Sequence, residues 1–219
     1  MGNYLNPGNS GFSNMRNDAY VDKTGMINLI NQTIDTPRNL TCISRPRRFG
    51  KSFAAKMLCA YYDKTCDSTA LFEGLEISQS KKYLDYLNQY DVIYLDLSGI
   101  LGATSPEDTV SYIKRNVTEE IRTAYPEVKT GEALFDTLAN TVAFTGNKIV
   151  MIIDEWDALI RESGGKEKLQ KEYLRFLRSL FKISSASTIT KALFIAGHTF
   201  EQTPQPVQSK GLICNLNFL

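Results

Sequence analysis

The segment from Arg45 to Ser52 holds the residue types that bind a polyphosphate, in the order Gly50-Lys51-Ser52. It follows the apolar run 40–44 and precedes a helical pattern, so loop N–H groups and a helix N-terminus would face one point. Gly50 would admit the backbone close to phosphate oxygens, and Lys51 would supply a charge for the β- and γ-phosphates. The Ser52 hydroxyl can ligate Mg²⁺. The sequence therefore predicts a phosphate-binding loop.

The match to the full pattern G-x-x-x-x-G-K-[ST] is incomplete, because Arg45 stands at the first glycine position and Pro46 removes one N–H donor. A basic surface turn, or a localisation-type patch at 45–48, is the alternative interpretation. The place of the segment between a buried strand and a helix favours the phosphate loop. We expect the nucleotide-binding residues to be Arg45, Pro46, Arg47, Arg48, Phe49, Gly50, Lys51, Ser52 and Phe53.

A second apolar run, 149–153, ends in the two carboxylates Asp154 and Glu155. Asp154 would hold Mg²⁺ next to the Ser52 hydroxyl, and Glu155 would orient or deprotonate an attacking water. Both are needed at one strand tip, on the carboxyl edge where open α/β sheets bind ligands. Alone, the pair could be a helix cap, but its occurrence with Gly-Lys-Ser favours catalysis. We expect Lys51, Asp154 and Glu155 to be catalytic, with Ser52 and Asp154 as metal ligands.

Other polar residues carry weaker signals. Asp157 and Arg161, four positions apart on a predicted helix, indicate a surface ion pair. Asp96 ends another apolar run and is a weaker candidate for the same edge. The chain has one histidine, His198, and four cysteines without a CxxC pair, so we expect no structural zinc site.

The elements that must position these residues follow from hydrophobic patterning. Four segments rich in β-branched residues are near-continuously apolar, which is typical of a parallel sheet covered on both faces: 40–44, 92–97, 149–153 and 192–196. Helical patterns lie around and between them: 52–62, 106–124, 132–143 and 166–181. This alternation predicts an α/β layered domain. Taken with the phosphate loop, it indicates a P-loop nucleoside triphosphatase fold, three-layer αβα with a mainly parallel sheet.

Composition and local character suggest three regions. Residues 1–25, rich in Asn and Gly, would form an ordered arm or loop; residues 26–197 would form the P-loop domain; residues 198–219 would form an irregular tail, without a complete helical lid. The net charge of +1 requires any basic recognition surface to be local. The absence of a long apolar run or a visible signal peptide predicts a cytoplasmic protein that does not cross a membrane.

Several motifs together resemble the predicted AAA-ATPase-like family of bacterial and archaeal proteins, in which an arginine commonly replaces the first glycine of the loop. Besides the loop, the similar segments are 5–9 with Gly11-Phe12, 20–24, 71–77 and 154–157. The resemblance runs from about Leu5 to Gly197 and implies a P-loop core of the additional-strand type with ATP and Mg²⁺ as ligands.

Family members usually continue into a helical region and often a nuclease-like domain, which we do not expect here. The family would also place a polar sensor residue near the last strand tip, where this chain has His198. ATP hydrolysis is the leading prediction. Arg47 or Arg48 would stabilise transition-state charge, or else be solvated or bind a partner. The alternatives are a nucleotide-dependent switch without turnover, and a nucleic-acid-binding module that uses Arg45, Arg47, Arg48 and Lys56.

Overall fold

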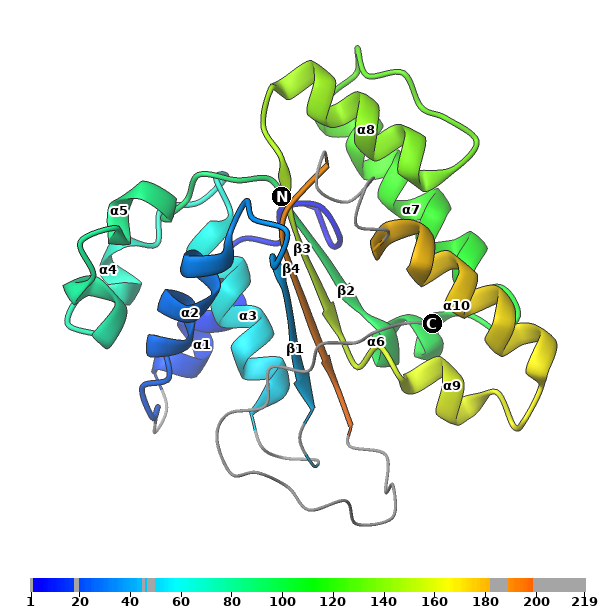
Figure 1. Ribbon diagram of the computed structural model, residues 1–219, viewed down its shortest axis with the longest axis horizontal. Coiled ribbons are helices and arrows are strands. Elements are labelled where there is room, and N and C mark those ends of the chain that lie inside the picture. Colours follow the sequence, from blue (N-terminus) through cyan, green and yellow to red (C-terminus); the bar gives the residue numbers. More distant parts are fainter. Residues whose placement is uncertain (1, 18–19, 45, 47–49, 182–188, 199–219) are drawn as a thin grey trace.

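The computed structural model describes residues 2–17, 20–44, 46, 50–181 and 189–198. A four-stranded sheet runs through the middle of the molecule (Figure 1), and every adjacent pair of strands is parallel. The strand order is β1-β4-β3-β2, so β4 separates β1 from β3 as an additional strand. The strands are β1 (Leu40–Ser44), β2 (Val92–Asp96), β3 (Ile149–Asp154) and β4 (Thr190–Gly197).

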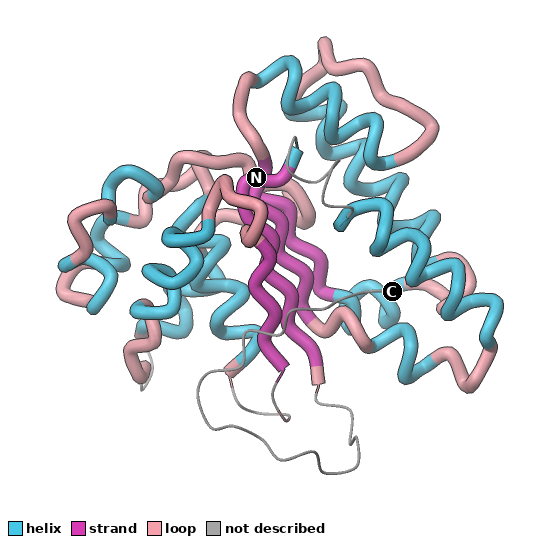
Figure 2. Tube along the Cα trace, in the orientation of Figure 1, coloured by secondary structure: helices cyan, strands magenta, loops and turns pink. Residues whose placement is uncertain are grey.

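Helices cover both faces of the sheet, as the tube in Figure 2 shows, and this confirms the predicted three-layer α/β fold. One face carries α1 (Ser10–Arg16), α2 (Gly25–Thr33), α3 (Lys51–Tyr62), α4 (Thr69–Phe72), the 3₁₀ helix η1 (Glu76–Gln79) and α5 (Tyr83–Tyr86). The other carries α6 (Leu97–Ala103), α7 (Thr109–Ala124), α8 (Leu134–Thr145), α9 (Ala158–Glu162) and α10 (Glu167–Phe181).

The four predicted helices correspond to α3, α7, α8 and α10, each within three residues at its start. The predicted strand 92–97 is one residue too long, because Leu97 begins α6. The Asp96 carboxylate accepts a hydrogen bond from the Gly99 backbone N–H (3.1 Å) and so caps that helix.

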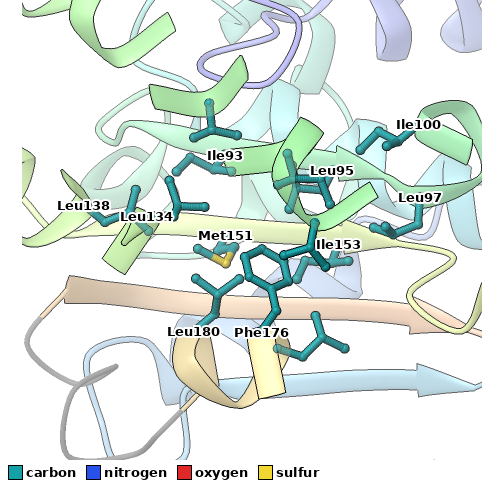
Figure 3. Close-up of a cluster of buried hydrophobic side chains, with 14 of the residues drawn as sticks. Ile93, Leu95, Leu97, Ile100, Leu134, Leu138, Met151, Ile153, Phe176 and Leu180 are labelled. Atoms are coloured by element: carbon teal, nitrogen blue, oxygen red, sulfur yellow. The ribbon is translucent and has the colours of Figure 1, made fainter. Parts of the chain in front are cut away.

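Alternate strand residues divide the core between the two faces. Ile149, Met151 and Ile153 of β3 pack with the face that carries α6 to α10, whereas Val150 and Ile152 pack with the α3 face. All six residues of β3 are buried, which explains why its sequence shows no polar alternation. Figure 3 shows Phe176 and Leu180 of α10 against Met151 and Ile153.

The segment ahead of β1 forms part of the core. Leu5 makes an antiparallel bridge with Ile93, and the Asn6 N–H donates to the Val92 carbonyl (2.7 Å), so this segment covers the β2 edge of the sheet. Phe12 of α1 is buried against α3. Helices α1 and α2 were not predicted, because seven and nine residues give too few turns for a clear periodic pattern.

Candidate functional site

The carboxyl ends of the strands form one edge of the sheet, at the side where the arrowheads lie in Figure 1. In the strand register Ser44 pairs with Gly197, and Asp154 pairs with Ala196. The end of β1 and the end of β3 are therefore level, with only β4 between them. The segment after β1 leads into α3, and the segment after β3 leads into α9.

Gly50, Lys51 and Ser52 stand at the beginning of α3. Gly50 precedes the helix with φ of +76°, a left-handed conformation that glycine adopts without strain. The Lys51 side chain is buried, and its Nζ donates to the Pro46 carbonyl (3.0 Å). The Ser52 side chain lies near enough to the Asp154 carboxylate to lower the pKa of that group, so the start of α3 and the tip of β3 meet here.

The alternation of side chains between the two faces of β3 explains this contact. Asp154 continues the alternation of Val150 and Ile152, the β3 residues that face α3. Ser52 lies in the first turn of that helix, so the two side chains meet at the sheet edge. The same two residues were predicted to lie next to each other around Mg²⁺.

Asp154 is in an unfavourable setting for a negative charge. Its side chain is almost fully buried, and burial raises the pKa of its carboxyl above the ordinary value. The neighbouring carboxylates of Asp96 and Glu155 raise the pKa of Asp154 further, while the bonds from Ser52 and from the Glu155 N–H lower it. A cation at this point would relieve the repulsion.

A hydroxyl in contact with a carboxylate fits Mg²⁺, which is commonly held by one or two protein ligands while phosphates and waters complete an octahedron. Within the described ranges, no group of three or more His, Cys, Asp or Glu side chains is arranged to hold a metal ion. Ser52 and Asp154 are thus a donor pair suited to a metal that arrives with a nucleotide.

Glu155 has a strained backbone, with φ of +51° in the left-handed region that non-glycine residues rarely occupy. The next residue fixes this turn from two sides. The Trp156 N–H donates to the Ala196 carbonyl of β4 (3.1 Å), and the Tyr173 hydroxyl of α10 donates to the Trp156 carbonyl (2.7 Å). The chain is thus held in a sharp turn, and the side chains of Asp154 and Glu155 point to different neighbours.

The Glu155 carboxylate accepts two hydrogen bonds from the elements that follow β2 and β3. Ser98 Oγ of α6 donates to Oε2 (2.7 Å), and Arg161 Nη2 of α9 donates to the same oxygen (3.1 Å). Arg161 Nε also donates to Asp157 Oδ2 (2.7 Å), which confirms the predicted ion pair. Its placement at the surface was right for Arg161, which is exposed, but wrong for Asp157, which is fully buried beneath the strand tips.

His198, the residue after β4, belongs to this group, although we expected it to begin an irregular tail. Its backbone N–H donates to Asp157 Oδ1 (3.1 Å). Its ring nitrogens are buried, with Nδ1 3.3 Å from Asp157 Oδ2 and Nε2 4.0 Å from Glu155 Oε1. Sequence reasoning missed the link of Ser98 and His198 to Glu155. His198 directly follows β4, and Ser98 lies two residues after the end of β2, so the ends of parallel strands, which identified Asp154, were also the signal here.

The structure places two further predicted residues, Phe53 and Asp96, away from the contact between Ser52 and Asp154 or in another role. Phe53 is exposed on α3. Asp96 lies opposite Asp154 in the register, where it caps α6. Arg45, Arg47, Arg48 and Phe49 lie outside the described residues, so their predicted contacts stay predictions.

The raised pKa of Asp154 makes a prediction about stability. The pKa of an aspartate in the unfolded chain is about 3.9, and the pKa of Asp154 in the folded protein is higher. As pH rises through these two pKa values, the folded protein therefore loses stability relative to the unfolded chain. At neutral pH, in EDTA and without nucleotide, Asp154→Asn should therefore unfold at a higher temperature than wild type. The gain should vanish below about pH 3.9. Exposed Asp85→Asn is the control and should show no gain. A lower unfolding temperature for Asp154→Asn at neutral pH would contradict the account.

The comparisons with known proteins identify the family of the chain. Within the described part of the chain, no helix is long and apolar enough to cross a membrane. The chain is 25% identical over 167 residues to an uncharacterized protein in the vnfD 5′ region of Azotobacter chroococcum mcd 1. That match covers 75% of this chain but 30% of the relative, so the chain spans less than a third of the relative's length. Residues 7–200 match the sequence model of the family described as Predicted AAA-ATPase, and the protein therefore belongs to the predicted AAA-ATPase family.

Proposed function

We propose that the protein binds ATP with Mg²⁺ at the carboxyl edge of its sheet and hydrolyses it. The observation that carries this proposal is the proximity of Ser52 and Asp154 at the sheet edge, where the ends of β1 and β3 are level. It brings the start of the helix after β1 and the acidic tip of β3 to one point, as a nucleoside triphosphatase requires. Family membership supports a nucleotide ligand.

The phosphate groups would be held by the beginning of α3. Its first N–H groups are unpaired within the helix and carry the positive end of the helix dipole. Lys51 Nζ, now bonded to the Pro46 carbonyl, would transfer to β- and γ-phosphate oxygens. The remaining predicted contacts come from the loop itself and from the next helical residue: Arg45, Arg47, Arg48, Phe49 and Phe53.

Hydrolysis breaks the bond between the γ-phosphorus and the bridging oxygen as water attacks in line, and ADP and phosphate leave. Magnesium held by Ser52 and Asp154 would supply a positive charge against the phosphate oxygens. Glu155 would orient the water and accept its proton. Because Ser98 and Arg161 both bond Oε2, the other oxygen, Oε1, would accept the proton of the water. Arg47 or Arg48 would stabilise the charge that develops on the phosphoryl group.

Lys51→Ala should reduce Mg-ATP affinity by about a hundredfold, because a buried charge-assisted contact to phosphate is lost. Isothermal titration calorimetry measures this directly. Lys56→Ala is the matched control, since Lys56 is an exposed lysine on the same helix and its loss should leave the affinity within about twofold. Equal affinity of wild type and Lys51→Ala would refute the phosphate site.

Glu155→Gln should bind Mg-ATP as well as wild type does but release phosphate about a hundredfold more slowly, because the amide cannot accept the proton of water. A phosphate-release assay with ATP and with GTP, next to titrations of the same samples, separates binding from turnover. Unchanged phosphate release in Glu155→Gln, at a rate well above background, would rule out Glu155 as the base.

A nucleotide-dependent switch without turnover is the second candidate. The observation that favours it is that Ser98 and Arg161 both bond Glu155 Oε2, which restrains the carboxylate that hydrolysis needs. This candidate requires Mg-ATP binding with phosphate release no faster in wild type than in Glu155→Gln.

A further inference from the structure

The segment 20–24 contacts the phosphate loop from a different part of the chain. The Lys23 ammonium nitrogen lies 3.5 Å from the point where a Cβ on Gly50 would stand. Gly50 has no side chain, and its left-handed backbone disfavours one. The space next to this turn is therefore open to the Lys23 ammonium and to any anion that the turn binds.

The backbone on either side of Lys23 is anchored. Asp22 Oδ1 accepts hydrogen bonds from the Thr24 N–H (2.8 Å) and hydroxyl (2.7 Å), and Oδ2 accepts one from the Glu76 N–H (2.8 Å). The Thr24 hydroxyl, fully buried, accepts a bond from the Ile77 N–H (3.1 Å). Burial tends to raise the pKa of Asp22, but these donors outweigh it and the pKa is lowered, so the anchor is a carboxylate.

Tyr20 ties the same segment to the helix that begins at the loop. Its hydroxyl lies 3.5 Å from Met57 Sδ of α3, and its ring packs edge-on against Phe12, with centroids 5.5 Å apart. Segment 20–24 thus rests on α3 at one end and on η1 at the other. The position of Lys23 relative to Gly50 is set by packed and hydrogen-bonded neighbours on both sides.

The Lys23 side chain itself is exposed, and no carboxylate of the described residues lies within ion-pair distance of it. It adds a positive charge to a place that already gathers Lys51 and the N-terminus of α3. Like charges brought together repel, and a polyphosphate of several negative charges is the ligand that would reverse this repulsion.

We propose that Lys23 is a second phosphate-binding lysine, which reaches the polyphosphate from segment 20–24, with Asp22 as the residue that positions it. This inference rests on the proposed function, since it assigns a further contact to the same nucleotide site. Asp22 and Thr24 hold the backbone, and Lys23 between them supplies the charge.

Lys23→Ala should weaken the binding of Mg-ATP and of Mg-pyrophosphate about tenfold each, as measured by calorimetric titration. Lys23→Arg should stay within about threefold of wild type, because it retains the charge. The matched control is Lys168→Ala, since Lys168 is exposed on α10 and makes no ion pair with a described residue; it should bind both probes as wild type does. Unfolding temperatures of the variants should be equal within error.

A double-mutant cycle tests the role of Asp22. If Asp22 acts by placing Lys23, Asp22→Ala should add no further loss of affinity in the Lys23→Ala background, although it weakens binding on its own. Fully additive losses would assign Asp22 a structural role that is independent of Lys23 and would overturn that part of the proposal.

The same titrations distinguish a failure of the Lys23 proposal from a failure of the proposed function. If Lys23→Ala binds both probes like Lys168→Ala while Lys51→Ala shows its expected loss of affinity, the Lys23 proposal is wrong and the proposed function stands. A loss with Mg-ATP but not with Mg-pyrophosphate would place Lys23 on the nucleoside and not on the phosphates. Wild-type protein that binds neither probe would overturn the proposed function and Lys23 together.

Discussion

The contact between the Ser52 hydroxyl and the Asp154 carboxylate depends on which face of the buried strand β3 each side chain points to. Every second residue of β3 faces α3, so a shift of the register by one position would turn Asp154 toward α10 and leave Ser52 without this partner. The apolar residues of β3 specify that register, because both faces of the strand are buried. The hydrophobic core and the acidic tip are consequences of the same alternation.

The strand tips combine features that oppose folding. Asp154 is buried near two other carboxylates, and Glu155 is held in a left-handed backbone conformation. Hydrogen bonds of the Trp156 backbone with β4 and α10 stabilise this turn, and Arg161 offsets part of the negative charge. Such strain and unbalanced charge are typical of a binding site whose ligand carries the compensating charge. Here that ligand would bring a cation to Asp154 and an anion to Lys51.

The sequence predicted the strands, the four longer helices and the edge on which Ser52 and Asp154 meet. These features depend on local patterns: continuous apolar runs, helical stripes and the rule that parallel strands end together. The remaining features depend on where distant segments dock. Spacing revealed the pair of Asp157 and Arg161 but not the burial of Asp157, which follows from its place beneath the strand tips. Likewise, nothing local in segment 20–24 brings Lys23 next to Gly50; its anchors on η1 and α3 do.

The most direct test of the central claim is the effect of Mg²⁺ on ATP affinity, measured by calorimetry in wild type, Ser52→Ala, Asp154→Asn and the double variant. If the two residues share one metal ion, Mg²⁺ should increase the affinity of wild type, and each single substitution should remove most of that increase. The double variant should then lose little more than either single one. Single variants that keep the full Mg²⁺ effect would contradict the account.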